Sequence, residues 1–347
     1  MRKSIKKYAL NIVWIVLFGG LAIYFTFRGD YNEVLGVLGN LSLFWLLIII
    51  LVSMIPYLLE GYILKMFANL YNKAYTYKQG LVNALSGGFF CGITPFSSGG
   101  QFAQVYIFKK QGIEPTNSVG ILLLYFIIYQ VSMVGYTLVI LLLKFNKFYT
   151  EFSSFVSLAL VGFIVNSVVI SALLAGAMSS RFQNFLTGTV LKIGHKCHLI
   201  KNYEVAKINL DHKLENFRTE LNVMRRHKKI ILKAFFLVLI RLTVQYSIPF
   251  LTMLALGEHL PITDYFDYLG ICAFIFLITA FIPIPGASGG SEATYVLLYG
   301  FVMGSVLAPS SMLIWRFSTY YIIMIIGCLV FSLNREINRR AREDDFI

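Results

Sequence analysis

The chain has 347 residues, of which 57% are hydrophobic and only 14% charged, and its mean hydropathy is +0.71. A single water-soluble core cannot bury that much apolar surface, so the bilayer must be the solvent for most of the chain, which excludes a soluble enzyme. The net charge of +13 comes from basic residues that fall between apolar runs. This distribution indicates membrane topology, and no nucleic-acid partner is expected.

Six apolar runs have the ~20 residues needed to cross the hydrocarbon core as helices. They cover residues 8–27, 41–59, 116–143, 152–178, 230–256 and 311–333. The first run follows a basic start and lacks a small-residue cleavage site, so we expect it to remain as an uncleaved span.

Two further apolar regions, 81–108 and 265–308, are interrupted near their middles by clusters of Gly, Pro and Ser. Such clusters cannot continue a helix and leave backbone groups free. The sequence therefore predicts an all-α polytopic membrane protein with about six full spans and two broken re-entrant helical hairpins. The second region has longer limbs, and two full spans remain an alternative for it.

Orientation follows from the short loops, because Lys and Arg in such loops stay cytoplasmic. A cytoplasmic N-terminus satisfies every loop and also places the C-terminus and the basic segment 181–229 in the cytoplasm. The first hairpin then enters the membrane from the cytoplasm, and the second enters from outside. The expected location is the cytoplasmic (inner) membrane.

Segment 181–229 is the only sizeable stretch between spans, and its apolar residues recur at helical spacing. These are Leu210, Leu214, Phe217, Leu221 and Met224. The segment is either a solvated connector or a helix whose upstream part lies on the anionic inner leaflet. Its cluster of His195, Cys197 and His198 matches no ligand spacing of a known metal geometry, so neither a metal nor another cofactor is expected.

The clearest motif occurs twice. Pro95-Phe96-Ser97-Ser98-Gly99-Gly100 and Pro285-Gly286-Ala287-Ser288-Gly289-Gly290 agree at four of six positions, with an offset of 190 in the numbering. The same offset moves span 41–59 onto 231–249 and span 116–143 onto 306–333. The chain therefore holds two copies of span, broken hairpin and span. The first copy begins outside and the second inside, so the copies are inverted relative to the membrane, as in many secondary transporters.

This pattern predicts a single transmembrane domain over residues 1–347. Its parts are a first span with an outer loop (1–40), the first repeat (41–143), a span with the basic connector (144–229), the second repeat (230–333) and a cytoplasmic tail (334–347).

Substrate sites of inverted-repeat transporters lie where the two broken elements meet. Glycines let backbone approach a ligand, and half-helices that start after Gly100 and Gly290 would direct N–H groups at an anion such as a lipid phosphate. The candidate substrate-binding residues of the two breaks are Thr94, Pro95, Ser98, Gly99, Gly100, Gln101, Gln104, Pro285, Ser288, Gly289 and Gly290. The alternative is that small residues simply permit close helix packing.

Charged side chains inside the spans complete the candidate site. A charge at the bilayer centre costs roughly 2.5 to 3.5 kcal/mol, so such residues usually face a cavity or a partner. Arg241 and Arg316, the latter followed by Tyr320, are expected to hold an anionic headgroup, while Glu292 orients one of them or binds a cationic headgroup. The alternative is a structural ion pair between Arg241 and Glu292. Glu60 is treated as an interfacial residue at the inner end of its span.

Three polar residues, Tyr125, Tyr129 and Gln130, form a stripe on the span 116–143. Two interpretations of the stripe stand equal, because such residues either line the same cavity or belong to a packed helix face.

Two motifs carry a resemblance to a known family. The first is Ile93 to Gln101 with Gln104-Val105-Tyr106. The second is Pro283 to Glu292, followed by Trp315-Arg316-Phe317 and Tyr320-Tyr321. Over essentially its whole length the chain resembles the flippase-like transmembrane domain of lysylphosphatidylglycerol synthases, the multiple peptide resistance factors. The resemblance implies a bacterial protein that moves an anionic or aminoacylated phospholipid, or a related lipid-linked compound, between leaflets. The expected partners are that lipid and either a second copy of the chain or a separate lipid-modifying enzyme.

The sequence departs from this family in two ways. Full-length synthases carry a soluble C-terminal domain that transfers lysine from lysyl-tRNA to phosphatidylglycerol, whereas this chain ends at Ile347, so lysyl transfer is not expected of it. The first motif carries Gln101 and Gln104 and no carboxylate, whereas the second contains the acid Glu292. The alternative functions are a membrane-embedded transferase on lipid substrates and an ion or proton carrier that uses Glu292. No P-loop motif is present, so a gradient or mass action would drive transport.

Overall fold

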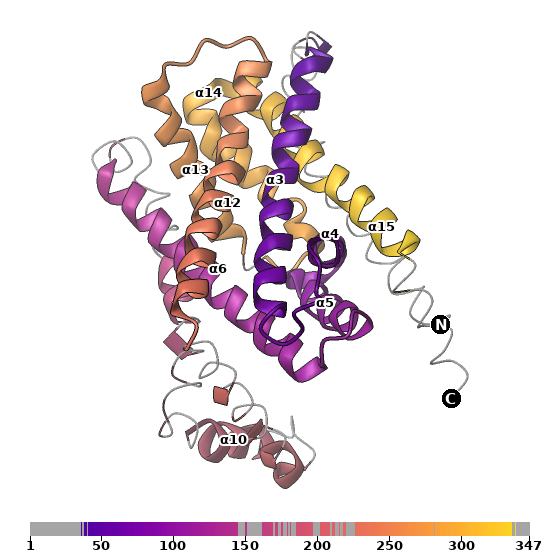
Figure 1. The fold of residues 1–347 in the computed structure, drawn as a ribbon. Helices are drawn as coiled ribbons and strands as arrows, with labels where there is room; N and C mark the ends of the chain where they lie inside the picture. Colours follow the sequence, from indigo (N-terminus) through magenta and orange to yellow (C-terminus); the bar gives the residue numbers. More distant parts are fainter. Residues whose placement is uncertain are drawn as a thin grey trace, which may run out of the picture.

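The computed structural model describes residues 41–144, 226–280 and 282–334, together with Gly36, 38–39, Ile337 and short stretches between 150 and 219. The predicted span 8–27, much of the span 152–178 and parts of segment 181–229, including Leu214, Phe217, Leu221 and Met224, lie outside the described residues. Within the described ranges the secondary structure consists of helices and turns (Figure 1).

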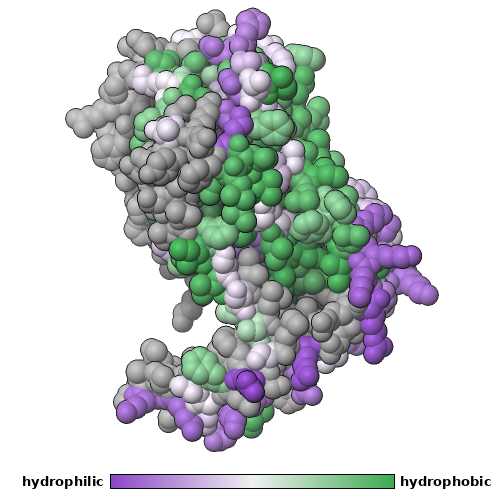
Figure 2. Space-filling model, turned by 90° about the vertical axis from the view of Figure 1, so that its left-hand side faces the viewer, coloured by the Kyte–Doolittle hydropathy of each residue, from purple (hydrophilic) through white to green (hydrophobic). Residues whose placement is uncertain are grey.

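Five helical elements of the described part are long and apolar enough to cross a membrane. Side chains exposed on their outer faces are largely hydrophobic, among them Leu43, Leu47, Phe236 and Ile240. Figure 2 shows hydrophobic residues over the middle of the bundle and hydrophilic residues gathered toward its ends. The predicted class of all-α polytopic membrane protein is confirmed.

The first repeat contains α3 (Leu43–Ala68), α4 (Tyr77–Gly92), the 3₁₀ turn η1 (Pro95–Ser97), α5 (Gly99–Lys110) and α6 (Pro115–Leu143). Thr76 begins α4 with a capping box, in which its hydroxyl accepts from the Gln79 N–H and the Gln79 side chain accepts from the Thr76 N–H. A proline stands in the first turn of both η1 and α6, where its missing N–H costs nothing.

The second repeat contains α12 (Lys228–Ala255), η3 (Ile262–Asp264), α13 (Tyr265–Thr279), η4 (Pro285–Ala287), α14 (Gly290–Arg316), the π-helix η5 (Phe317–Tyr321) and α15 (Ile322–Leu333). Helix α14 is two limbs, because Gly304 has φ +80° and ψ 177°. The Tyr295 and Trp315 rings stack with centroids 4.8 Å apart, although a straight helix over this distance in the sequence would separate them by ~30 Å. The limbs therefore fold back on each other.

The elements of the two repeats correspond in order, at close to the offset that relates Pro95 to Pro285. Helix α12 corresponds to α3, α13 to α4, η4 to η1, the first limb of α14 to α5, and the rest of α14 with η5 and α15 to α6. The repeats are inverted because α3 and α12 pack antiparallel. Lys233, early in α12, donates to the Tyr62 hydroxyl (2.8 Å), and Arg241, further along α12, donates to the Pro56 carbonyl (3.2 Å), which lies earlier in α3.

The first helix of each broken region is short. Helix α4 has 16 residues and α13 has 15, or 18 with η3, which at 1.5 Å per residue makes α4 ~24 Å and α13 with η3 ~27 Å long, against a hydrocarbon core of ~30 Å. The turns η1 and η4 contact each other, so the hairpins enter from opposite ends of the bundle and meet inside it. Of the two alternatives for the second region, this geometry favours the re-entrant hairpin.

Helix α3 is longer than the sequence predicted, since it continues from residue 59 to Ala68. Its C-terminal part packs on the first hairpin through two glycines. A Cβ atom on Gly80 would collide with the Gly61 carbonyl oxygen, and a Cβ on Gly61 would lie 2.8 Å from the Leu81 Cα. This close backbone approach fixes the hairpin against α3.

We expect Gly80→Ala to destabilise the protein by about 1 to 3 kcal/mol, because the new methyl group meets backbone that cannot move aside. Thermal unfolding in detergent measures the effect. The matched control is Gly135→Ala in α6, where a Cβ has nothing within 4 Å. If both variants unfold at the same temperature, the contact between α3 and α4 is not as close as described.

Candidate functional site

The two hairpin turns share one backbone conformation. We call residues Thr94–Gly100 the first tip and residues Ile284–Gly290 the second tip. Phe96 has φ 54° and ψ 19°, and Gly286, at the equivalent position of the second tip, has φ 60° and ψ 17°. The next residues, Ser97 and Ala287, have φ 53° and 51°. Three non-glycine residues in the left-handed region are uncommon and mark a backbone held by its surroundings.

The hydrogen bonds of the turns also repeat. Ser98 N–H donates to the Pro95 carbonyl (3.1 Å), and Ser288 N–H donates to the Pro285 carbonyl (3.2 Å). The predicted internal repeat therefore extends from the helix order down to individual turn bonds.

Side chains of the first tip form hydrogen bonds to the backbone of the same hairpin and so stabilise its turn. The Thr94 hydroxyl donates to the Phe90 carbonyl (2.7 Å) and accepts from the Gly99 N–H (2.8 Å), and the Ser98 hydroxyl donates to the Pro95 carbonyl (2.9 Å). Pro95, Ser98 and Gln101 are exposed, while Gly100 is buried, and a Cβ there would collide with the Cys91 sulfur.

The second tip is held by a buried ion pair. Arg316 Nε lies 2.8 Å from Glu292 Oε1, and their side chains are 8% and 1% exposed. Arg316 Nη2 donates to the Gly286 carbonyl (2.7 Å) and to the Ser288 hydroxyl (3.2 Å). Glu292 Oε2 accepts from the Gly289 N–H (2.8 Å) and from the Ser291 hydroxyl (2.7 Å), so the carboxylate caps the N-terminus of α14.

Other candidates of the second tip complete this packing. Pro285 is buried, and a Cβ on Gly290 would collide with the Ile282 side chain. The Tyr320 ring lies over the Arg316 guanidinium, with 3.8 Å from Cζ to the ring centroid. Arg316, Glu292, Ser288 and Tyr320 thus form one cluster.

A second buried ion pair joins the two repeats. Arg241 Nη2 of α12 lies 2.9 Å from Glu60 Oε2 of α3, and the Gln104 amide donates to Glu60 Oε1 (3.2 Å). The Arg241 guanidinium lies 5.0 Å from the centroid of the Tyr129 ring. Gly87 makes room for this arrangement, because a Cβ there would lie 2.7 Å from the Gln104 amide.

Two sequence interpretations were therefore wrong. Arg241 pairs with Glu60 and not with Glu292, which pairs with Arg316. Glu60 is not interfacial, since it lies inside α3 with 8% of its surface exposed. The apolar residues Gly61-Tyr62-Ile63-Leu64 after it, with no helix breaker, were the signal that could have located it.

The polar stripe of α6 divides between two surroundings. Tyr129 lies beside Arg241, and the centroids of the Tyr129 and Tyr125 rings are 6.4 Å apart. Gln130 instead donates to Asn166 (2.8 Å) of the following span. The stripe is thus partly site and partly packed helix face.

The two ion pairs lie on either side of the end of α4. Gly87 and Gly88 face Gln104 and Tyr57, near the Glu60–Arg241 pair, whereas Gly92 faces Tyr320, near the Glu292–Arg316 pair. The rise from Gly87 to Gly92 is ~7.5 Å along the helix axis.

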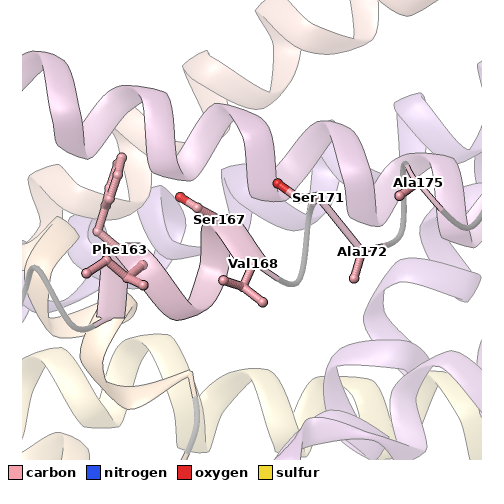
Figure 3. A pocket seen from close by; sticks show the side chains of 7 residues that line it. Phe163, Ser167, Val168, Ser171, Ala172 and Ala175 are labelled. Carbon is pink, nitrogen blue, oxygen red and sulfur yellow. The ribbon is translucent and has the colours of Figure 1, made fainter. Parts of the chain in front are cut away.

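Two hollows lie elsewhere on the described surface. One is lined by residues of 163–175, with Phe163, Ser167 and Val168 among them (Figure 3). The other lies between α6 and α12, with Ile128 and Phe235 in its wall. Neither includes a residue of the ion pairs, which are enclosed by packed protein.

Inverted repeats, broken hairpins that meet tip to tip and buried charges beside them define a polytopic membrane protein built from two related halves. The family model of the lysylphosphatidylglycerol synthase TM region matches residues 12–327, and the chain belongs to this family. No curated protein matches the chain significantly.

We expect Arg241→Met to destabilise the protein by about 3 to 5 kcal/mol, because it leaves the buried Glu60 carboxylate without its partner. Adding Glu60→Gln should recover most of the loss. The measurement is a double-mutant cycle on thermal stability in detergent.

Glu292→Gln is the matched control for this cycle, because Glu292 pairs with Arg316. Its effect should add to that of Arg241→Met without coupling. Strong coupling of Arg241 to Glu292, and none to Glu60, would contradict the described pairing.

Proposed function

We propose that this protein is a lipid translocase that moves an anionic or aminoacylated phospholipid, or a related lipid-linked compound, between leaflets. The observation that carries the proposal is the contact between η1 and η4, the turns of the two broken hairpins, which belong to inverted repeats. In transporters of this plan the substrate site lies at such a meeting point.

The chemistry of the second tip suits a headgroup phosphate. A phosphate approaching Arg316 would compete with the Glu292 carboxylate for the same guanidinium and for the N-terminus of α14. The displaced carboxylate would then be free to take a cationic part of an aminoacylated headgroup. A headgroup that supplies both a phosphate for Arg316 and an ammonium group for Glu292 keeps every buried charge compensated, so this exchange costs less than opening the ion pair alone.

The glycines on α4 support a short route between the two charge clusters. Gly87, Gly88 and Gly92 present backbone, without side chains, toward the Glu60–Arg241 pair on one side and Tyr320 on the other. Arg241 in its pair with Glu60 offers the same phosphate-binding chemistry as Arg316. In the proposed mechanism a headgroup passes this stretch of α4 while its acyl chains stay in the bilayer, as the two repeats rock or gate around it.

The proposed setting is a bacterial cytoplasmic membrane with both termini inside. One end of the bundle, where α3 ends and α12 begins, carries Lys65, Lys73, Lys78, Lys109, Lys110, Lys228 and Lys229, and the other end carries Glu258, Asp264 and Asp267. Basic residues concentrate on the cytoplasmic side of short loops, so the first end would face the cytoplasm.

In liposomes with labelled phospholipid, we expect the reconstituted protein to accelerate leaflet exchange and Glu292→Gln to reduce the acceleration at least tenfold. The substitution removes the charge that orients Arg316 while it keeps the size of the side chain. The control is Glu114→Gln, which changes an exposed acid at the start of α6.

If the wild-type protein exchanges lipid between leaflets no faster than protein-free liposomes do, the proposal is wrong. Mass spectrometry of the same lipids, incubated with aminoacyl or glycosyl donors, tests the transferase alternative, since a transferase would create a lipid of new mass. Lipid-independent ion currents that vanish in Glu292→Gln would instead favour an ion carrier.

A further inference from the structure

Tyr320 contacts both hairpins at once. Its hydroxyl donates to the Gly92 carbonyl at the end of α4 (2.9 Å), far away in the sequence. Its ring covers the Arg316 guanidinium, which in turn donates to the Gly286 carbonyl of the second tip. The side chain is 9% exposed, so its contacts are with protein.

The bond to Gly92 meets a need that the first hairpin cannot meet alone. The last carbonyls of a helix have no partner within the helix, and inside a bilayer an unsatisfied carbonyl costs several kcal/mol. The first hairpin supplies Thr94 to the Phe90 carbonyl, and Tyr320 of the other repeat supplies the donor to Gly92. The last carbonyl of α4 therefore depends on the second repeat for its hydrogen bond.

The sequence difference between the tips points to the same residue. Phe96 and Gly286 have nearly the same φ and ψ, so this turn does not require glycine, and the Phe96 side chain is 61% exposed. A Cβ on Gly286 would collide with the Tyr320 ring and hydroxyl. Glycine at 286 is thus favoured twice, by the positive φ of the turn and by the position of Tyr320, which leaves no room for a side chain.

The local helix geometry brings Tyr320 to this position. Tyr320 lies in the π-helix η5, a widened turn often found at functional sites. By the repeat offset, Tyr320 corresponds to Gln130, the residue after Tyr129, which lies beside Arg241.

We propose that Tyr320 is a positioning residue that latches the two tips together. Its hydroxyl holds the end of α4 against the second tip, and its ring keeps Arg316 aligned with Glu292. The role of the latch in transport rests on the proposed translocase function, whereas the latch itself is tested without lipid transport.

The test measures maleimide labelling of Cys91, which precedes Gly92 and donates to the Ser97 carbonyl inside the first hairpin (3.3 Å). Cys197, Cys272 and Cys328 are replaced by Ala in the full-length protein. Tyr320→Phe should raise the labelling rate by about two- to tenfold, the population shift expected when one hydrogen bond is lost. Tyr106→Phe, which removes an exposed hydroxyl on α5, is the matched control and should label as the wild type does.

Equal labelling of wild type, Tyr320→Phe and Tyr106→Phe overturns the latch, whether or not the protein exchanges lipid. Leaflet exchange then tests the positioning role. Tyr320→Phe keeps the ring over Arg316, so it should slow exchange less than Tyr320→Ala does. Tyr320→Ala should lose it, and an equal loss in Tyr320→Phe contradicts the role of the ring.

Gly286→Ala provides an independent check. It should raise Cys91 labelling as Tyr320→Phe does, because the methyl group displaces Tyr320. In a Tyr320→Ala background its effect should be clearly smaller, with only the strain of the positive φ remaining, since contacting sites couple in a double-mutant cycle. The same effect of Gly286→Ala in both backgrounds would mean that the turn itself needs glycine, which overturns this part of the argument.

Discussion

The fold depends on one constraint, which is that backbone broken inside a hydrocarbon layer must find its hydrogen-bond partners within the protein. Both hairpins interrupt a helix within the apolar part of the bundle, where the freed N–H and C=O groups need partners. Each tip makes two i to i+3 bonds of a 3₁₀ turn, and the bond that Ser98 makes in the first tip recurs at Ser288 in the second. The remaining groups need side chains, and the choice of those side chains determines where charge, hydroxyls and glycines stand in the sequence.

The two tips satisfy this constraint differently. The first uses a local hydroxyl, Thr94, and a donor from the other repeat, Tyr320. The second uses charged groups, with Glu292 on the Gly289 N–H and Arg316 on the Gly286 carbonyl. The first tip is therefore nearly neutral and largely exposed, whereas the second is charged and more buried. The repeats share a backbone plan, but the chemistry available to a ligand differs between them. The charge near the first hairpin is the pair of Glu60 on α3 with Arg241 on α12, which belongs to the second repeat.

Sequence reasoning predicted the elements whose signals are local. Hydropathy located α6 to within a residue, and the Pro-x-x-Ser-Gly-Gly motifs located both tips. It failed for the charge pairs, because a position in the sequence gives depth along a helix but not the face on which a side chain lies. Arg241 and Glu292 were both judged deep, yet they belong to different clusters. Glu60 was misplaced because the end of the most hydrophobic run was taken as the end of α3. The left-handed Phe96 and Ser97 had no sequence signal, since the surroundings impose that conformation.

Charge balance links this architecture to movement. Each buried arginine has one carboxylate, so neither cluster carries net charge, and this lowers the cost of burying them in a bilayer. A pair opened without replacement would cost about 3 to 5 kcal/mol, which slows any step that requires it by a factor of ~10² to 10³ or more. A ligand with both an anionic and a cationic group would remove that penalty, because its anion pairs with the arginine and its cation pairs with the displaced carboxylate. In the proposed function, the Glu292–Arg316 pair that stabilises the second tip is therefore also the pair that such a ligand would open.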